Sequence, residues 1–265
     1  MQLKNPTEII GASMTVAESK IATTRNRPWR LLLAAIAAGA FIAIGGILSL
    51  TVGFGFPGAA ASCPALPKLL AGATFPIGLI LVVVLGAELF TGNNALLIPA
   101  YMERRYRLTD VVGNWTIVYI GNFFGAVGFT YLFVYLAGLT ASDPWHSAIL
   151  TITSAKTSMS WGVTLLKGIG ANWFVCLAVW LALSGHNLLE KAFGCWLPVM
   201  AFVVLGYEHC IANMFYLPLG LLEGSDVSVG DCIWRNLVPA TIGNIIGGAV
   251  FVGMLHWYLS RPRRD

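Results

Sequence analysis

Six long apolar stretches constrain the fold of this chain more than any other feature. Each is long enough to cross a bilayer as a helix, which takes about 20 mostly apolar residues. They fall near residues 30–54, 68–102, 110–138, 161–184, 192–222 and 233–259. Transmembrane strands would instead need alternating segments of about 10 residues. We therefore predict an all-α integral membrane protein with six transmembrane helices, in a single transmembrane domain over residues 1–265.

The composition agrees with lipid as the main solvent of the chain. Hydrophobic residues make up 57% of it and charged residues only 11%, whereas a soluble domain carries about 25% charged residues. That leaves too little polar surface to cover a globule in water. The first apolar stretch has no small-residue cleavage site followed by a soluble domain, so we interpret it as a span and not as a removable signal peptide.

Lysine and arginine gather on one side of the predicted spans. Those on this side are Lys4, Lys20, Arg25, Arg27, Arg30, Arg104, Arg105, Arg107, Lys191, Arg261, Arg263 and Arg264. The other side has only Lys68 and Lys156, with Lys167 and Arg235 near helix entries. Because such residues mark cytoplasmic loops, we predict a multi-pass protein of the cytoplasmic membrane with both termini in the cytoplasm. The net charge of +4 reflects this asymmetry and does not indicate nucleic-acid binding.

Two motifs recur at about half the chain length. Residues 86–93 and 206–213 both read G-x-E-x4-N, 120 residues apart, and residues 121–125 and 243–247 both read G-N-x-x-G, offset by 122. Two matches in the same order at nearly the same offset indicate an internal repeat. Each half then holds three spans, and an odd number inverts the second half across the membrane. We place the inverted repeats at approximately 28–140 and 157–260.

The G-x-E-x4-N copies fall in the middle of spans two and five. Glycine, glutamate and asparagine at that depth predict broken helices 2 and 5, since irregular backbone inside a membrane is tolerated where it lines a cavity or is buried in protein. In inverted-repeat proteins such breaks meet at the midplane and form the pathway. The alternative is a pair of glycine kinks that serve packing alone.

Ionisable residues at membrane depth are candidates for function. His209 lies in the second break, where it would face Thr91, although a lone buried histidine is more often a core residue. We expect Glu88 and Glu208 to accept backbone N–H groups that the breaks set free.

The asparagines of the repeated motifs have a structural interpretation. Small residues let helices approach closely, and asparagine can hydrogen-bond across the contact. We assign Asn93, Asn122, Asn213 and Asn244 to structure.

Neither a cofactor nor a catalytic site is indicated. The five cysteines form no C-x-x-C pair. Glu208-His209 is not H-E-x-x-H, no second histidine lies within helical reach, and no G-x-S-x-G elbow occurs. We predict no metal, no cofactor and no enzymatic activity.

Several long motifs of the chain resemble those of the formate/nitrite transporter family. They lie at residues 75–79, 86–93, 167–180, 206–214 and 236–248, in the order found in that family. The resemblance implies an aquaporin-like fold and a homopentamer in which each protomer carries its own pore. It also implies that formate, nitrite, hydrosulfide or a related small monovalent anion is the substrate.

The resemblance further implies roles for particular residues. The central histidine corresponds to His209, opposite Thr91. The outer-vestibule lysine corresponds to Lys156, with Glu208 and Asn172 nearby. Two apolar constrictions flank the centre: an outer one of Phe75 and Phe202, and an inner one of Leu79, Leu89, Phe90 and Val175.

Formate is the favoured substrate because the bulky constrictions and the Phe-Pro-x-Gly-Leu segment resemble formate channels. Nitrite and hydrosulfide channels of the same family are alternatives of the same class. A membrane-embedded enzyme that uses Glu208 and His209 as acid and base is an alternative of a different class. A purely structural membrane scaffold would leave the charges at the midplane unexplained.

Overall fold

The structure, a computed structural model, describes residues 4–260 and is helical. In chain order its elements are α1 (Pro6–Asn26), α2 (Pro28–Phe54), α3 (Pro57–Ser62), α4 (Ala65–Thr74), α5 (Ile77–Leu85), α6 (Phe90–Leu96), α7 (Ile98–Met102), α8 (Leu108–Phe129), η1 (Thr130–Tyr135), α9 (Trp145–Ser158), α10 (Trp161–Ser184), α11 (Leu188–Val204), α12 (Cys210–Leu222), α13 (Val229–Asp231), η2 (Cys232–Leu237), α14 (Val238–Gly248), η3 (Ala249–Met254) and α15 (Leu255–Leu259). The three η segments are π-helical.

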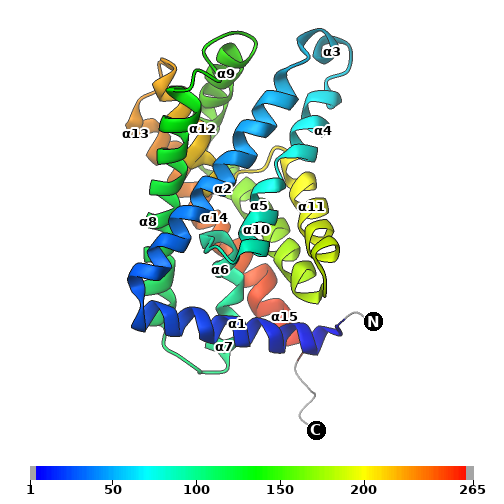
Figure 1. The fold of residues 1–265 in the computed structure, drawn as a ribbon, viewed down its shortest axis with the longest axis vertical. Helices are drawn as coiled ribbons and strands as arrows, with labels where there is room; N and C mark the ends of the chain where they lie inside the picture. Colours follow the sequence, from blue (N-terminus) through cyan, green and yellow to red (C-terminus); the bar gives the residue numbers. More distant parts are fainter. Residues whose placement is uncertain (1–3, 261–265) are drawn as a thin grey trace.

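The six predicted crossings are confirmed. Within residues 4–260, five helical segments are long and apolar enough to span a membrane: 28–54, 65–85, 108–135, 161–184 and 229–259. The remaining crossing is divided between α11 and α12 because its helix is broken. The core elements stand roughly parallel to the long axis of the molecule, and both ends of the described chain lie at the same end of it (Figure 1). We call this end the terminal face.

The two broken crossings run in opposite directions. In Figure 1, α4 and α5 descend from the far end to the middle, and α6 and α7 continue to the terminal face. The α11 helix rises from near the terminal face, and α12 continues to the far end. Both breaks begin at a glycine with left-handed backbone, Gly86 at φ 71° and Gly206 at φ 68°, a conformation that other residues adopt at a cost. The predicted broken helices and their inverted arrangement are confirmed.

The unbroken helices pair in the same way in both halves, α2 along α8 and α10 along α14. Glycines of the G-N-x-x-G motifs permit the close approach. A Cβ on Gly125 would meet the carbonyl oxygen of Ile36 at 1.9 Å, and one on Gly247 would meet that of Ile169 at 2.2 Å. These contacts confirm that the motif glycines serve helix packing.

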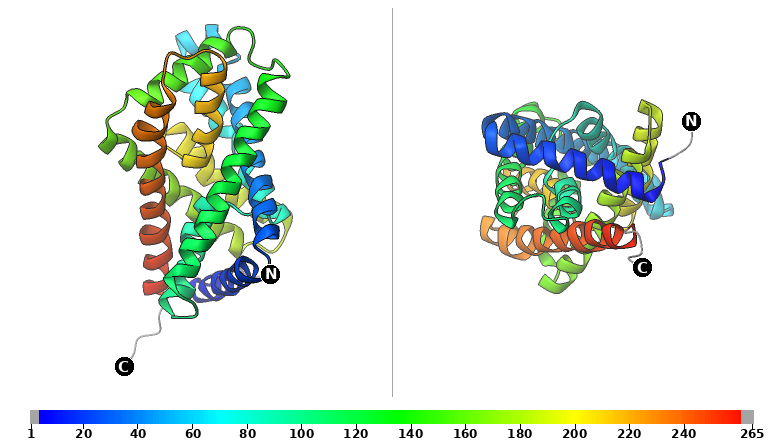
Figure 2. Two further views of the ribbon diagram at one scale, coloured as in Figure 1. Left: turned by 90° about the vertical axis from the view of Figure 1, so that its left-hand side faces the viewer. Right: turned by 90° about the horizontal axis from the view of Figure 1, so that it is seen from below.

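Two further helices precede the repeats. The α1 helix lies across the terminal face, nearly at right angles to the crossings (Figures 1 and 2). It starts with Pro6 after a capping box in which Asn5 and Glu8 exchange side-chain-to-backbone hydrogen bonds. The α9 helix precedes the second half at the far end (Figure 1). Neither helix was predicted from the sequence.

Candidate functional site

Two cavities open toward opposite faces of the helix bundle. The near vestibule, at the terminal face, has a volume of about 300 Å³, and its lining includes Lys4, Lys20, Leu79, Leu89, Asn93 and Lys191. The far vestibule has a volume of about 370 Å³, and its lining includes Lys68, Phe75, Lys156, Phe202, Glu208 and His209. The two breaks therefore lie between a pair of cavities.

Thr91 and His209 meet between these vestibules, as predicted. Thr91 lies in the first turn of α6 and His209 is the N-cap of α12, so each follows one of the breaks. Thr91 Oγ1 lies 3.0 Å from His209 Nε2, and both side chains are buried. The inverted repeat brings together two residues that are 118 positions apart.

The other nitrogen of His209 determines the tautomer of the neutral ring. The Ala212 N–H donates to His209 Nδ1 over 3.0 Å and so caps α12. Because Nδ1 accepts, the neutral ring carries its hydrogen on Nε2, which donates to Thr91 Oγ1. A doubly protonated ring would have to give up the bond from Ala212.

Apolar side chains border this polar pair on both sides. The rings of Phe75 and Phe202 lie edge to face with centroids 5.9 Å apart, and Phe202 stacks on His209 at 5.8 Å. Leu79 and Leu89 line the inner end of the near vestibule and are almost fully buried. These four residues lie where both constrictions were expected.

Phe90 and Val175, also expected in the inner constriction, line neither vestibule. Both are buried in the main apolar core. The Phe90 ring packs edge-on against Trp115 and Tyr119 of α8, with centroids 6.3 and 4.9 Å away.

Two asparagines hold the start of each half-helix after a break. The Asn122 Oδ1 accepts the Phe90 N–H over 2.9 Å, and the Asn244 Oδ1 accepts the Cys210 N–H over the same distance. Each side chain also donates to two backbone carbonyl oxygens, one of them that of Glu88 or Glu208. We expected the glutamate carboxylates to accept the freed N–H groups; the asparagines do so instead.

The Glu208 carboxylate belongs to a buried polar cluster beside the far vestibule. It accepts hydrogen bonds from Lys156 Nζ at 3.0 and 3.1 Å, from Asn213 Nδ2 at 2.8 Å and from Asn236 Nδ2 at 3.0 Å. Lys156 also lies over the Tyr216 ring, with Nζ 5.5 Å from its centroid. The expected proximity of Lys156 and Glu208 is thus found.

The Glu88 carboxylate has a matching cluster beside the near vestibule, and the lysine of this cluster was not predicted from the sequence. Lys20 Nζ donates to Glu88 over 2.6 Å, and Asn93 Nδ2 donates to it over 2.9 Å and to Asn114 Oδ1 over 2.9 Å. Lys20 was interpreted only as a topology signal. The repeat could have predicted this pair: Glu88 and Glu208 occupy equivalent positions, so a lysine that pairs with Glu208 implies another that pairs with Glu88.

Asn172 does not lie beside the far vestibule, contrary to our expectation. It is fully buried, and its Nδ2 donates to the carbonyl oxygens of Thr91 and Asn244 and to Asn94 Oδ1. Asn172 therefore supports the backbone that carries Thr91. Its position in the middle of α10 brings it against α6 and α14 and away from the cavity.

The part of the chain that the structure describes holds no group of three metal-ligating His, Cys, Asp or Glu side chains. The Cys176, Cys195, Cys210 and Cys232 thiols are free and buried, and Cys63 is exposed. Neither observation bears on activity by itself.

Inverted membrane helices with a buried polar pair between two vestibules define a class, the membrane transport proteins with one pathway per chain. Residues 7–258 match the family model described as formate/nitrite transporter. The chain belongs to the formate/nitrite transporter family.

Individual relatives support this assignment. A probable formate transporter of Methanothermobacter thermautotrophicus is 37% identical, over 96% of both chains. A solved structure described as an FNT family ion channel superposes with a TM-score of 0.88 at 29% identity, covering 96% of this chain and 100% of that one. A pentameric formate channel with formate bound superposes with a TM-score of 0.75 at 32% identity, covering 88% and 97%.

Proposed function

We propose that this protein conducts formate across the membrane, through a pathway contained within each chain of a homopentamer. The Thr91–His209 pair carries the proposal, because this buried polar contact lies between two vestibules that the described residues form on opposite faces. Two of the relatives described above are a probable formate transporter and a pentameric formate channel with formate bound. Nitrite and hydrosulfide remain alternative substrates of the same pathway.

The geometry favours passage of the neutral acid. Lys156 in the far vestibule and the three lysines of the near vestibule attract a monovalent anion into the pathway. The Phe75–Phe202 and Leu79–Leu89 side chains then strip its water, which is costly for a bare anion. As the surroundings become less polar, the conjugate acid is favoured over the anion. The acid takes its proton from vestibule water or from His209 and passes the Thr91–His209 pair.

The ion-pair clusters support transport over catalysis. Glu208 is engaged by Lys156, Asn213 and Asn236, and His209 Nδ1 by the Ala212 N–H. The Glu208 carboxylate is therefore not free to serve with His209 as the acid–base pair that the enzyme alternative requires. The protein is not an enzyme in this proposal.

The charge distribution supports cytoplasmic termini. The terminal face carries α1 and the loop before α8, where Arg25, Arg105 and Arg107 lie. Arg25 pairs with Asp110 and Arg105 pairs with Glu18. The loops of this face hold most of the arginine and lysine, which the positive-inside rule assigns to the cytoplasm. The far vestibule then opens to the cell exterior.

Flux into proteoliposomes that contain only this protein tests the substrate. Formate, nitrite and hydrosulfide are supplied at equal gradients, and initial rates are compared at equal protein content. We expect formate to enter fastest and protein-free vesicles to show only slow leakage of its neutral acid. Faster entry of nitrite or hydrosulfide would replace formate as the substrate, and no protein-dependent flux of any of them would contradict transport itself.

Replacing Lys156 with alanine is expected to slow anion flux about 10-fold at low ionic strength, because steering by a charge in a low-dielectric mouth is worth at least that factor. The change also leaves the buried Glu208 carboxylate without its cation, so the vestibule repels anions. Initial formate rates in low and high salt measure the effect.

A matched control removes a charge from the same end of the protein without entering the cavity. Arg235 is exposed and pairs with Asp231 outside the far vestibule, so Arg235→Gln should leave the rate unchanged. Lys156→Arg should retain most of the flux. Equal rates for Lys156→Ala and wild type in low salt would remove Lys156 from the entry step.

A further inference from the structure

The lining of the near vestibule carries more positive charge than is required to balance one monovalent anion. Lys4, Lys20 and Lys191 all line it, and its lining includes no acidic side chain. The far vestibule is lined by Lys68 and Lys156 together with the Glu208 carboxylate. Among the described residues, the two mouths of the pathway therefore differ in charge although the repeat relates their backbones.

Two of the three ammonium groups in the near vestibule lack a counter-charge. Lys20 is paired with Glu88 at 2.6 Å. Lys4 Nζ donates to the carbonyl oxygen of Leu183 over 2.8 Å, a neutral partner. The Lys191 ammonium group makes no hydrogen bond or ion pair with any of residues 4–260; its backbone N–H donates to the carbonyl oxygen of Asn187. About two positive charges thus share a cavity of about 300 Å³.

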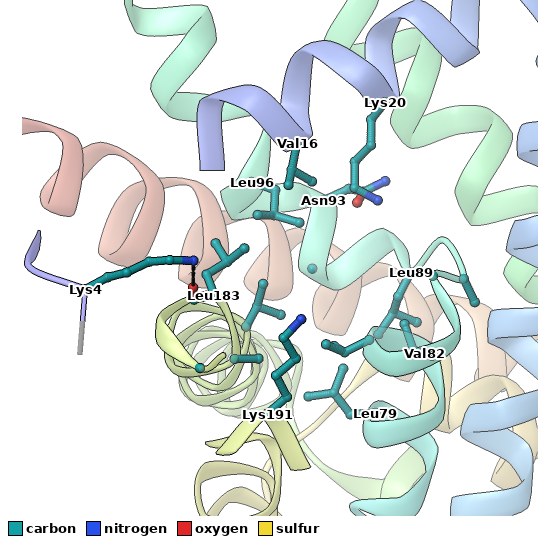
Figure 3. Close-up of a pocket in the computed structure, with 17 residues that line it drawn as sticks. Lys4, Val16, Lys20, Leu79, Val82, Leu89, Asn93, Leu96, Leu183 and Lys191 are labelled. Atoms are coloured by element: carbon teal, nitrogen blue, oxygen red, sulfur yellow. Dashed lines mark hydrogen bonds between the residues drawn. The ribbon is translucent and has the colours of Figure 1, made fainter. Parts of the chain in front are cut away.

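The three lysines approach the cavity from different elements (Figure 3). Lys4 precedes α1, Lys20 lies in the second half of α1, and Lys191 lies in the first turn of α11. The remaining lining is mostly apolar, including Leu79, Val82 and Leu89. Apolar walls focus the field of the lysines onto the cavity, so an anion held there is attracted more strongly than at an open surface.

We propose that the near vestibule binds a divalent oxyanion, with hydrogen phosphate as its simplest form, and that the bound anion blocks the pathway. Two uncompensated ammonium groups match a charge of two, and the lysine donors match the several acceptor oxygens of a phosphate. The cavity has room for such an ion with part of its water. The block rests on the proposed function, while the binding does not.

A divalent oxyanion would stop at the leucines instead of passing them. The cost of transferring an ion to an apolar medium rises with the square of its charge, so a dianion pays about four times the penalty of a monovalent ion. One proton makes formate neutral but leaves phosphate charged. The bound ion would contact both Lys4, at the start of the described chain, and Lys191 on α11, and would therefore fill the entrance to the pathway.

Binding is measured first, by calorimetric titration of the purified full-length protein with inorganic phosphate at constant ionic strength, with chloride as the monovalent comparison. We expect one phosphate per chain in preference to chloride, and at least about 10-fold weaker binding by the Lys4→Gln/Lys191→Gln variant, since two charge-assisted contacts are lost. The control is Arg30→Gln, which removes an exposed charge near the same face outside the cavity. Equal phosphate binding by the double variant, or none by wild type, would overturn the site.

Flux tests the block separately. Formate uptake is compared in proteoliposomes with and without phosphate on both sides, at matched ionic strength, so that chain orientation in the vesicle is immaterial. We expect phosphate to lower the wild-type and Arg30→Gln rates severalfold and to leave the double variant insensitive. Phosphate that binds without lowering the wild-type rate would refute the block. If no variant conducts formate at all, the proposed function fails, and the calorimetric result still decides the binding site.

Discussion

Replacing His209 with phenylalanine is expected to lower formate flux by about 10- to 100-fold. The change removes the Nε2–H that meets Thr91 and the Nδ1 that caps α12. Hydrogen bonds to charged groups are worth about 1.5–3 kcal/mol, and a formate that reaches this point has already lost its water to the phenylalanine and leucine side chains. Without the His209 imidazole, only the Thr91 hydroxyl of this pair remains to offset that loss.

Asparagine at the same position separates polarity from proton transfer. It is a good N-cap and can still accept the Ala212 N–H, but it does not titrate between pH 5 and 8, as an imidazole can. His209→Asn is therefore expected to retain downhill formate flux and to lose uptake that an inward proton gradient stimulates.

Initial rates from pH 5 to 8, at equal content of folded protein, distinguish the two roles of His209. A histidine that serves only the core predicts a lower yield of folded protein for both variants and an unchanged rate per folded chain. Identical pH profiles for wild type and both variants would exclude His209 from proton handling. The result bears directly on the His209 ring, because charging it requires Nδ1 to release the Ala212 N–H.

The transmembrane fold could be predicted because polar residues are rare in membrane-spanning segments and therefore mark irregular backbone. Glycine, glutamate and asparagine inside an apolar stretch are costly unless the helix breaks there, and both copies of G-x-E-x4-N coincide with breaks. The repeat then fixed the inverted arrangement. Since each break approaches the midplane from its own face, the meeting of Thr91 and His209 followed from the sequence.

The partners of the polar side chains were harder to predict, since spacing alone does not tell which group reaches which. Glu88 and Asn122 both lie near the first break, and either could accept the freed Phe90 N–H. The close approach of α8 to α2 brings the asparagine to it, and the carboxylate turns to Lys20. The same choice recurs with Glu208 and Asn244.

Lys20 and Asn172 were misjudged for related reasons. The α1 segment is polar and carries no sequence pattern that predicts where it packs. Only its position across the terminal face brings Lys20 beside Glu88. Asn172 lies in a motif that resembles the family's, and its proximity to the far vestibule was inferred from that resemblance. Its depth in α10 brings it instead against the backbone of Thr91. Both depend on packing between elements that no local pattern reports.

Replacing Asn244 with leucine is expected to destabilise the fold and to abolish most flux. Its side chain is fully buried. The Oδ1 accepts the Cys210 N–H over 2.9 Å, and the Nδ2 donates to the carbonyl oxygens of Gly168 and Glu208 over 2.8 and 2.9 Å. A buried group left unpaired costs about 1–3 kcal/mol, so we expect the free energy of unfolding to fall by about 3 kcal/mol and the melting temperature in detergent to fall by roughly 10 °C.

Asn122→Leu, the equivalent change in the other half, should have the same effect. Ile242→Ala, on the same helix but 40% exposed, should change little. Flux per folded chain should also fall for Asn244→Leu, because the Cys210 N–H it holds directly follows His209. Thermal unfolding and flux indistinguishable from those of Ile242→Ala would show that Asn244 neither fixes the break nor places the histidine.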